Sequence, residues 1–134
     1  MFYIELKTGF QHDGPAWIAR VEVSKSGRTI YFDGRALKRG QGIRGNYFDL
    51  ESGAEYWISG VKKTGCNRHW GGAGTIDIEE GVVAEYLALR GLSLLPSGLA
   101  VVADFPHTTG GTFVRAENKP LLKPRLPPTK GKAQ

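Results

Sequence analysis

The sequence has a single cysteine and no long apolar run. Cys66 alone cannot form an internal disulfide or a zinc site built from several thiolates, and a lone thiol is typical of a reducing compartment. The most apolar stretch, residues 92–105, is interrupted by serine, proline, glycine and aspartate, which excludes a membrane span of about 20 residues. The first residues show no basic segment followed by an apolar core, as a secretory signal would, so we expect a cytoplasmic protein that does not bind membranes.

Charge is segregated along the chain, although the net charge is only +5. Residues 28–44 carry +4 and residues 62–70 carry +3, and the segment after each of them carries −3. If the two basic segments fold onto one face, they form an electrostatic surface suited to a polyanion. If they are dispersed, they only improve solubility.

Short alternating segments bounded by glycine, aspartate and asparagine fill residues 1–91. Residues 2–7 and 17–23 alternate with a period of two, which is typical of half-buried antiparallel strands. Asp33 and Gly34 form the dipeptide that a two-residue type I′ hairpin prefers. The pattern predicts four to six strands.

One helix is predicted near the end of this region, at about residues 78–90. Asp77 and Glu80 have the spacing of a capping box, apolar residues then recur at helical spacing, and Gly91 stands where a C-cap glycine belongs. We therefore expect a mainly β fold: a small, partly open antiparallel barrel of SH3-like or OB-like kind, or an antiparallel sheet, closed by one C-terminal α-helix.

The chain changes character after Gly91, which predicts three parts. Residues 1–91 form a compact β-rich domain that ends in the helix. Residues 92–116 form a loosely attached segment, with 99–103 and 112–115 as a hairpin that nearby prolines restrict to edge positions. Residues 117–134 contain four prolines and five basic residues, and we expect a disordered basic tail with a polyproline tendency.

The segment Tyr56-Trp57-Ile58-Ser59-Gly60-Val61-Lys62-Lys63, continuing through Gly65 to Arg68-His69-Trp70, resembles the core of a family of short, uncharacterised bacterial proteins. The resemblance covers roughly residues 1–91, and the tail after it departs from the usual length. It implies a bacterial origin and a compact single domain. It assigns no functional residue.

Residues 40–45 have the spacing of a dinucleotide-binding glycine motif. A turn and a strand follow them instead of a helix, and the chain has no room for the required βαβ unit, so we predict no cofactor. Arg35, Lys38, Arg39 and Arg44 surround the three glycines, so the loop is either an anion cradle or a plain solvated loop.

Cys66 and His69 place a thiol and an imidazole in one loop. Nucleophilic catalysis would also need an orienting acid and an oxyanion hole, and no particular aspartate is selected by the sequence. His12 and His107 are distant in sequence, and the four residues together match no zinc signature. We therefore predict a protein that is not an enzyme and holds no metal; a Cys66/His69 enzyme with a reactive thiol is the third hypothesis.

Aromatic and basic residues are interleaved in the two positive segments, a composition typical of a stacking platform beside a phosphate-binding groove. We predict binding of nucleic acid, single-stranded by preference, and the competing interpretation is that these aromatics simply form the core. The predicted phosphate-binding residues are Arg35, Lys38, Arg39, Arg44, Lys62, Lys63 and Arg68, with Trp70 and Tyr47 for stacking; Arg28 belongs to the same interleaved set.

The alternative function is a protein-interaction module that uses an exposed strand edge or the tail. Pro124-Arg125-Leu126-Pro127-Pro128 has the PxxP spacing that aromatic grooves accept. Nucleic-acid binding predicts an affinity that falls steeply with salt, and the alternative predicts no such response. The oligomeric state is left open.

Overall fold

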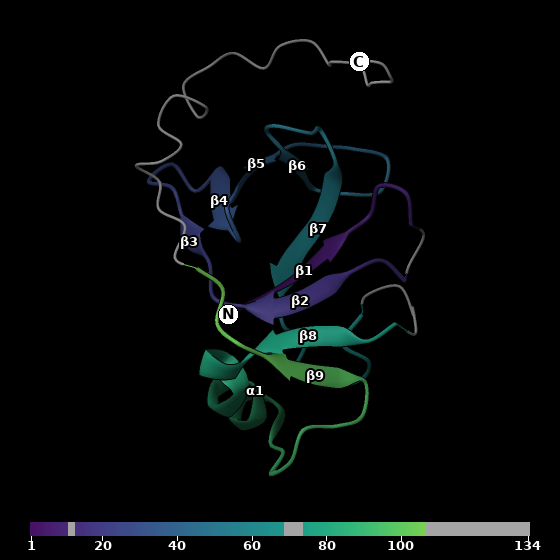
Figure 1. The fold of residues 1–134 in the computed structure, drawn as a ribbon, viewed down its shortest axis with the longest axis vertical. Coiled ribbons are helices and arrows are strands. Elements are labelled where there is room, and N and C mark those ends of the chain that lie inside the picture. The colour runs from purple at the N-terminus through teal and green to yellow at the C-terminus, as the bar shows by residue number, and fades with distance from the viewer. Residues whose placement is uncertain (11–12, 69–73, 107–134) are drawn as a thin grey trace.

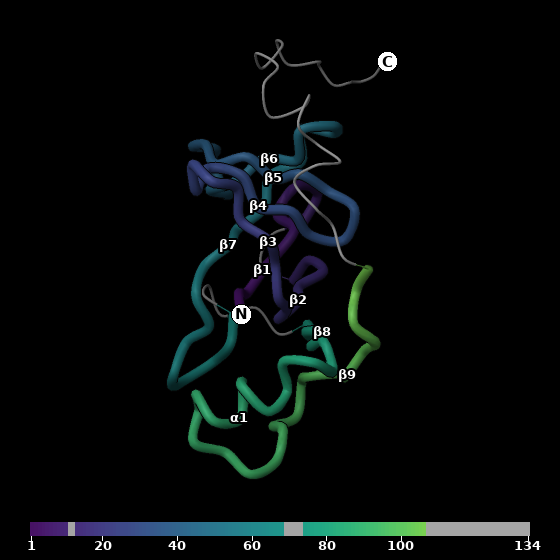
Figure 2. The backbone as a smooth tube through the Cα atoms, turned by 90° about the vertical axis from the view of Figure 1, so that its left-hand side faces the viewer, coloured from purple at the N-terminus to yellow at the C-terminus, as the bar shows by residue number. Residues whose placement is uncertain are grey.

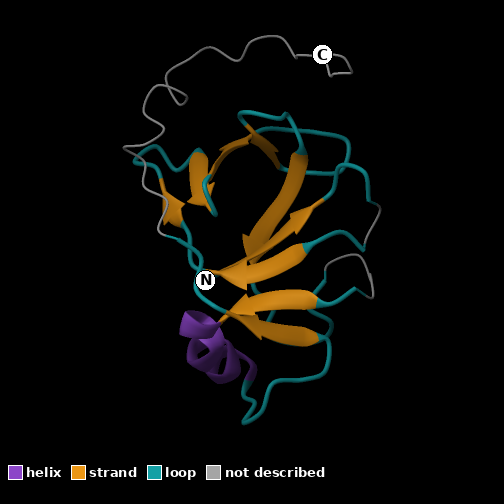
Figure 3. Cartoon of the chain, viewed as in Figure 1, coloured by secondary structure: helices purple, strands orange, loops and turns teal. Residues whose placement is uncertain are grey.

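Nine strands among the described residues form one continuous, curled sheet in the order β3-β4-β5-β6-β7-β1-β2-β8-β9 (Figure 1). The computed structural model describes residues 1–10, 13–68 and 74–106. The strands are β1 (Phe2–Leu6), β2 (Ala16–Ala19), β3 (Glu22–Val23), β4 (Thr29–Phe32), β5 (Arg35–Arg39), β6 (Tyr47–Asp49), β7 (Glu55–Gly60), β8 (Ile76–Glu79) and β9 (Leu99–Val102). The sheet curls into a half-barrel, which confirms the mainly β prediction (Figure 3).

The sheet combines an antiparallel meander with a parallel edge. Strands β3, β4, β5 and β6 each pair with the next strand in sequence, all antiparallel. β1 lies between β7 and β2 and is antiparallel to both. β8 then pairs in parallel with β2, and β9 in parallel with β8, which the sequence did not predict.

Both faces of β1 are buried, and its period-two pattern separates two hydrophobic clusters. Ile4 lies inside the curl with buried residues of β2, β4, β5, β6 and β7. Tyr3 points to the opposite face, where it packs with Ile18 and with Tyr86 of the helix α1 (Val83–Arg90). The predicted alternation of residues 2–7 is therefore confirmed, but the polar face is buried as well.

Two local predictions are confirmed by backbone angles. Asp33 and Gly34 connect β4 to β5 with φ of 51° and 74°, as a type I′ turn requires of both central residues. Gly91 ends α1 in the left-handed conformation with φ of 68°. Both signals are local, since each depends on the backbone freedom of the turn residues themselves.

The predicted start of the helix is wrong. Asp77 lies within β8, paired with Trp17 and Ala100, because Ile76 and Ile78 on either side of it are buried and extend the period-two pattern to Glu79. Residues 80–82 then form a 3-10 turn, η1 (Glu80–Val82), before α1 begins. Glu79 precedes η1 and its side chain makes no capping hydrogen bond there.

Residues 92–106 pack against the rest of the domain, and the edge strand expected at 99–103 is present as β9. β9 continues the sheet, so α1 is not C-terminal. The Phe105 ring packs against Phe32 with centroids 5.0 Å apart, and the Glu79 carboxylate accepts the backbone N–H groups of Phe105 at 2.7 Å and Arg20 at 2.8 Å. The proposed hairpin strand 112–115 and the tail 117–134 lie outside the described residues.

Candidate nucleic-acid interface

Four basic side chains gather at one end of the β4–β5 hairpin. Lys38 pairs with Thr29 across the hairpin, and the Arg39 backbone N–H donates to the Arg28 carbonyl at 2.7 Å. Arg44 belongs to the loop that follows Arg39 and returns to β6. We call the side chains of Arg28, Lys38, Arg39 and Arg44 the basic end. The strands β5 and β6, between which Arg44 lies, are at the end of the molecule away from α1 (Figure 2).

The side chains of the basic end are accessible and carry uncompensated charge. Arg28, Arg39 and Arg44 are exposed, and Lys38 is half-buried. Within the described part of the chain, none of the four forms an ion pair. The basic end is therefore available to an anionic ligand.

Tyr47 lies beneath the basic end and cannot stack on a base. Its ring is 6% exposed and belongs to the cluster inside the curl. The Arg39 guanidinium lies over that ring, 5.9 Å from its centroid. Tyr47 therefore orients Arg39 through a cation–π contact, which corrects its predicted role.

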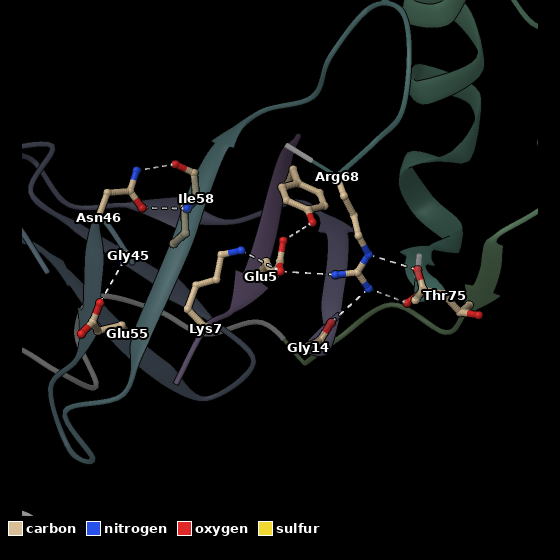
Figure 4. Close-up of polar contacts among 11 residues, drawn as sticks. Glu5, Lys7, Gly14, Gly45, Asn46, Glu55, Ile58, Arg68 and Thr75 are labelled. Carbon is tan, nitrogen blue, oxygen red and sulfur yellow. Dashed lines mark hydrogen bonds and ion pairs between the residues drawn. The ribbon is translucent and has the colours of Figure 1, made fainter. Parts of the chain in front are cut away.

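The glycine-rich loop does not form a vacant anion cradle. The backbone N–H groups of Arg44 and Gly45 both donate to Glu55 Oε1 at 2.9 Å, and Figure 4 shows the bond from Gly45. A Cβ atom at Gly42 would lie 2.4 Å from the same oxygen, so glycine permits the close approach of this carboxylate. The chain's own Glu55 thus occupies the amides that the sequence interpretation assigned to a phosphate.

Asn46 holds the base of this loop against β7. Its side-chain Nδ2 donates to the Ile58 carbonyl and its Oδ1 accepts the Ile58 N–H, both at 2.8 Å (Figure 4). The amide therefore continues the β6–β7 ladder beyond its last backbone pair, Tyr47 with Tyr56. Sequence reasoning missed Asn46 and Glu55, although the predicted hairpin around residues 51–53 already placed residues before 47 beside those after 55.

Arg35 lies at the other end of β5 and is paired. Its Nη1 is 2.9 Å from Asp49 Oδ2, and Asp49 is 3% exposed. Because this carboxylate offsets much of its charge, Arg35 is less available to an anionic ligand than the basic end is.

Lys62 and Lys63 lie in the β7–β8 connection, beside α1. Arg90 of α1 donates to the Lys62 carbonyl at 3.0 Å, and Lys62 Nζ donates to the Arg68 carbonyl at 3.3 Å. Figure 1 shows α1 at one end of the molecule and β5 and β6 toward the other. The structure therefore does not bring the two predicted basic segments onto one face.

Arg68 is buried and cannot reach a phosphate, which corrects its predicted role. Its side chain is 3% exposed, and its Nη1 lies 3.3 Å from Glu5 Oε2. Its other N–H groups donate to the carbonyls of Gly14, Gly74 and Thr75 at 3.0 to 3.3 Å (Figure 4). Arg68 thus links the β1–β2 loop and the β7–β8 connection to β1.

The same Glu5 carboxylate binds two further side chains of β1 and its continuation. Tyr3 Oη donates to Oε1 at 2.5 Å, and Lys7 Nζ donates to Oε2 at 2.9 Å. Lys7 and Glu5 are each 1% exposed. We call Tyr3, Glu5, Lys7 and Arg68 the buried charge cluster; its role is to hold the sheet and the loops together.

The remaining predicted residues fall partly outside the described residues. Trp70, His69, His12 and His107 lie there, so the stacking role of Trp70 and the Cys66/His69 pairing stay predictions; Cys66 itself is exposed. Across residues 1–10, 13–68 and 74–106, no group of three histidine, cysteine or acidic side chains is placed to hold a metal ion. No helix in that part of the chain is long and apolar enough to cross a membrane.

Comparisons with known protein families, with curated proteins and with solved structures find no match. The resemblance to a bacterial family therefore stays a prediction. The fold and site define a small, mainly β domain with an accessible basic end.

Proposed function

We propose that this protein is a non-enzymatic domain that binds nucleic acid, preferentially single-stranded, through contacts between phosphates and the basic end. The observation that carries the proposal is the group of four basic side chains that have no carboxylate partner among the described residues. Such charges attract a polyanion and neutralise its phosphates on contact.

The surroundings of the basic end support a positive local potential. Of the carboxylates on β6 and β7, Asp49 is paired with Arg35, and Glu55 accepts the loop amides but keeps a single negative charge, which the four cations of the basic end outnumber. Other acidic side chains gather elsewhere, around a cavity of about 240 Å³ whose lining includes Glu22, Glu79 and Asp104. A polyanion is therefore attracted to one part of the surface and repelled from another.

As part of the same proposal, we assign the half-barrel to the partly open SH3-like or OB-like barrels. OB-like barrels bind oligonucleotides on one face and use basic grooves that track the backbone. Because Tyr47 is buried, base stacking by the described site residues has no role here, and we expect little sequence preference.

The first prediction concerns two double variants with equal changes in charge. Arg39→Glu with Arg44→Glu removes half of the basic end, whereas Lys62→Glu with Lys63→Glu changes the segment beside α1. We expect the first variant to weaken binding and to reduce the slope of log affinity against log salt by roughly 1.4, because a single strand contributes about 0.7 per phosphate contact. The second variant should keep most of the wild-type slope.

The measurement is fluorescence anisotropy of a labelled oligothymidylate titrated with the full chain, between about 50 and 200 mM salt. Equal losses in both variants would show that net charge alone drives binding and would contradict the proposed site. No binding by the wild type at low salt, or tighter binding to a duplex of the same length, would also contradict the proposal.

A further inference from the structure

The tip of the loop between β5 and β6 exposes an isoleucine beside the basic end. Ile43 is 92% exposed, more than any other large apolar side chain that the structure describes. It directly precedes Arg44, which belongs to the basic end. Single exposed apolar side chains are common on protein surfaces, so exposure alone does not assign a role to Ile43. Its surroundings do.

Ile43 and Arg44 line a cavity together with the chain that follows β1. The cavity has a volume of about 260 Å³, and the residues that line it are 7–9, Ile43, Arg44 and Glu55. This volume lies below the range of about 300 to 1,000 Å³ that is usual for sites of drug-sized ligands. The cavity therefore suits a group as small as one nucleobase.

Glu55 holds both walls of the cavity in place. Its backbone carbonyl accepts the Lys7 N–H at 2.9 Å, and its own N–H donates to Thr8 Oγ1 at 2.7 Å. On the other side, its carboxylate accepts the N–H groups of Arg44 and Gly45. The cavity is therefore formed before a ligand arrives, so binding requires little ordering of the chain.

The charges around the cavity favour a neutral base over a phosphate as its occupant. The Glu55 carboxylate repels a phosphate from the interior. The Lys7 ammonium binds Glu5 and is 1% exposed, so it does not offset this repulsion. Arg44 both lines the cavity and belongs to the basic end, so a strand whose phosphates contact the basic end has its bases within reach of the cavity.

We propose that this cavity is a subsite for one nucleobase of the bound strand, and that Ile43 packs against the face of that base. The inference rests on the proposed nucleic-acid function, because phosphate contacts at the basic end bring the strand to the cavity. A base must be unpaired to enter, which agrees with a preference for single strands. Isoleucine has no group that reads a base edge, so this contact adds no sequence preference.

The test compares the binding of two labelled oligomers of equal length and charge to the full chain by fluorescence anisotropy. One is an oligothymidylate, and the other is an oligomer of abasic deoxyribose phosphates. We expect the wild type to bind the oligothymidylate about five- to tenfold more tightly, because a base that covers Ile43 removes apolar surface from water. Since both oligomers carry the same phosphates, this ratio should persist when the salt is raised.

Ile43→Ser should bring the affinity for the oligothymidylate close to that for the abasic oligomer. It should leave the dependence of affinity on salt unchanged, because no charge is altered. The matched control is Leu94→Ser, since Leu94 is 80% exposed in the connection from α1 to β9 and does not line the cavity. This control should bind both oligomers as the wild type does.

Three results would overturn the subsite: equal affinity of the wild type for the two oligomers, an unchanged preference in Ile43→Ser, or an equal loss of preference in Leu94→Ser. Each of them requires binding through phosphates, so the proposed function would stand while the subsite fails. A wild type that binds neither oligomer at low salt would refute both.

Discussion

The Glu5 carboxylate lies between the Lys7 ammonium and the Arg68 guanidinium, and these side chains are 1% to 3% exposed. Removing charges from water is costly, and close pairing with several hydrogen bonds offsets that cost only while every partner is present. Glu5 is therefore a sensitive position, because it compensates two buried cations at once.

We expect Glu5→Gln to lower the free energy of unfolding by about 3 to 5 kcal/mol, since it leaves buried cations without their carboxylate. The matched control is Glu85→Gln, which breaks the ion pair with Arg20, whose two side chains are 53% and 65% exposed, and which should cost no more than about 1 kcal/mol. Urea denaturation of both variants measures the difference. Equal losses would show that the buried pair has no special weight.

Tyr3 gives the fold a dependence on alkaline pH. Burial, together with the hydrogen bond to Glu5 and its negative charge, raises the pKa of Tyr3 far above the ordinary value of about 10. Burial also raises the pKa of Tyr56. Below pH 10 or so both phenols are protonated in the folded and unfolded chains, and their full contribution to stability is present.

As the pH rises above about 10, the unfolded chain releases these protons and the folded chain retains them, so stability falls. Tyr3→Phe removes one of the two phenols and should make this fall shallower, although it also loses the bond to Glu5 at neutral pH. Urea denaturation at intervals between about pH 8 and 11 tests this. An equally steep fall in the variant would exclude Tyr3 as a cause.

At the scale of elements, the loop between β5 and β6 is fixed by contacts to β7. A Cβ atom at Gly45 would lie 2.6 Å from the Tyr56 carbonyl oxygen and 2.9 Å from the Tyr56 nitrogen, both backbone atoms that cannot easily move. Gly60, at the other end of β7, has nothing within 4 Å of the equivalent position. Backbone atoms of β7 thus exclude a side chain at position 45, whereas position 60 has room for one.

Gly45→Ala should therefore destabilise the protein by roughly 1 to 3 kcal/mol, as overpacking against rigid atoms does. Gly60→Ala should change stability by less than about 1 kcal/mol, since Ala has the same or better strand preference and no clash. Thermal unfolding of the two variants checks the difference. A Gly45→Ala protein as stable as Gly60→Ala would mean that the loop does not lie against Tyr56.

The sequence predicted those elements whose signals are local. The Asp33–Gly34 turn and the Gly91 cap depend on residues that readily adopt positive φ. The alternation of residues 2–7 is visible within a single strand. The bond from Asn46 to Ile58 and the pairing of β9 with β8 depend on partners distant in sequence. The sequence also did not predict that the polar side chains on β1 are buried, because their partner Arg68 is distant from them in sequence.

At the scale of the whole molecule, the path of β7 explains why the predicted site divides. β7 begins at Glu55 beside the glycine-rich loop and ends at Gly60 opposite Phe2, so the chain has left the basic end before it reaches Lys62. Two charged segments of a sequence form one charged face only when the topology places both on the same side of the fold. Arg39 and Arg44 share an end because a single hairpin connection joins them.

The position of β1 has a consequence for how the chain folds. β1 and β2 are neighbours in sequence and can form a hairpin early, yet β1 also pairs with β7 and β2 also pairs with β8. The meander β3 to β7 needs only neighbours in sequence, and it can form while the first hairpin still lacks its outer partners. Closing those long loops costs entropy before any contact repays it, so we expect folding in the range of milliseconds to seconds that is typical of non-local β topologies.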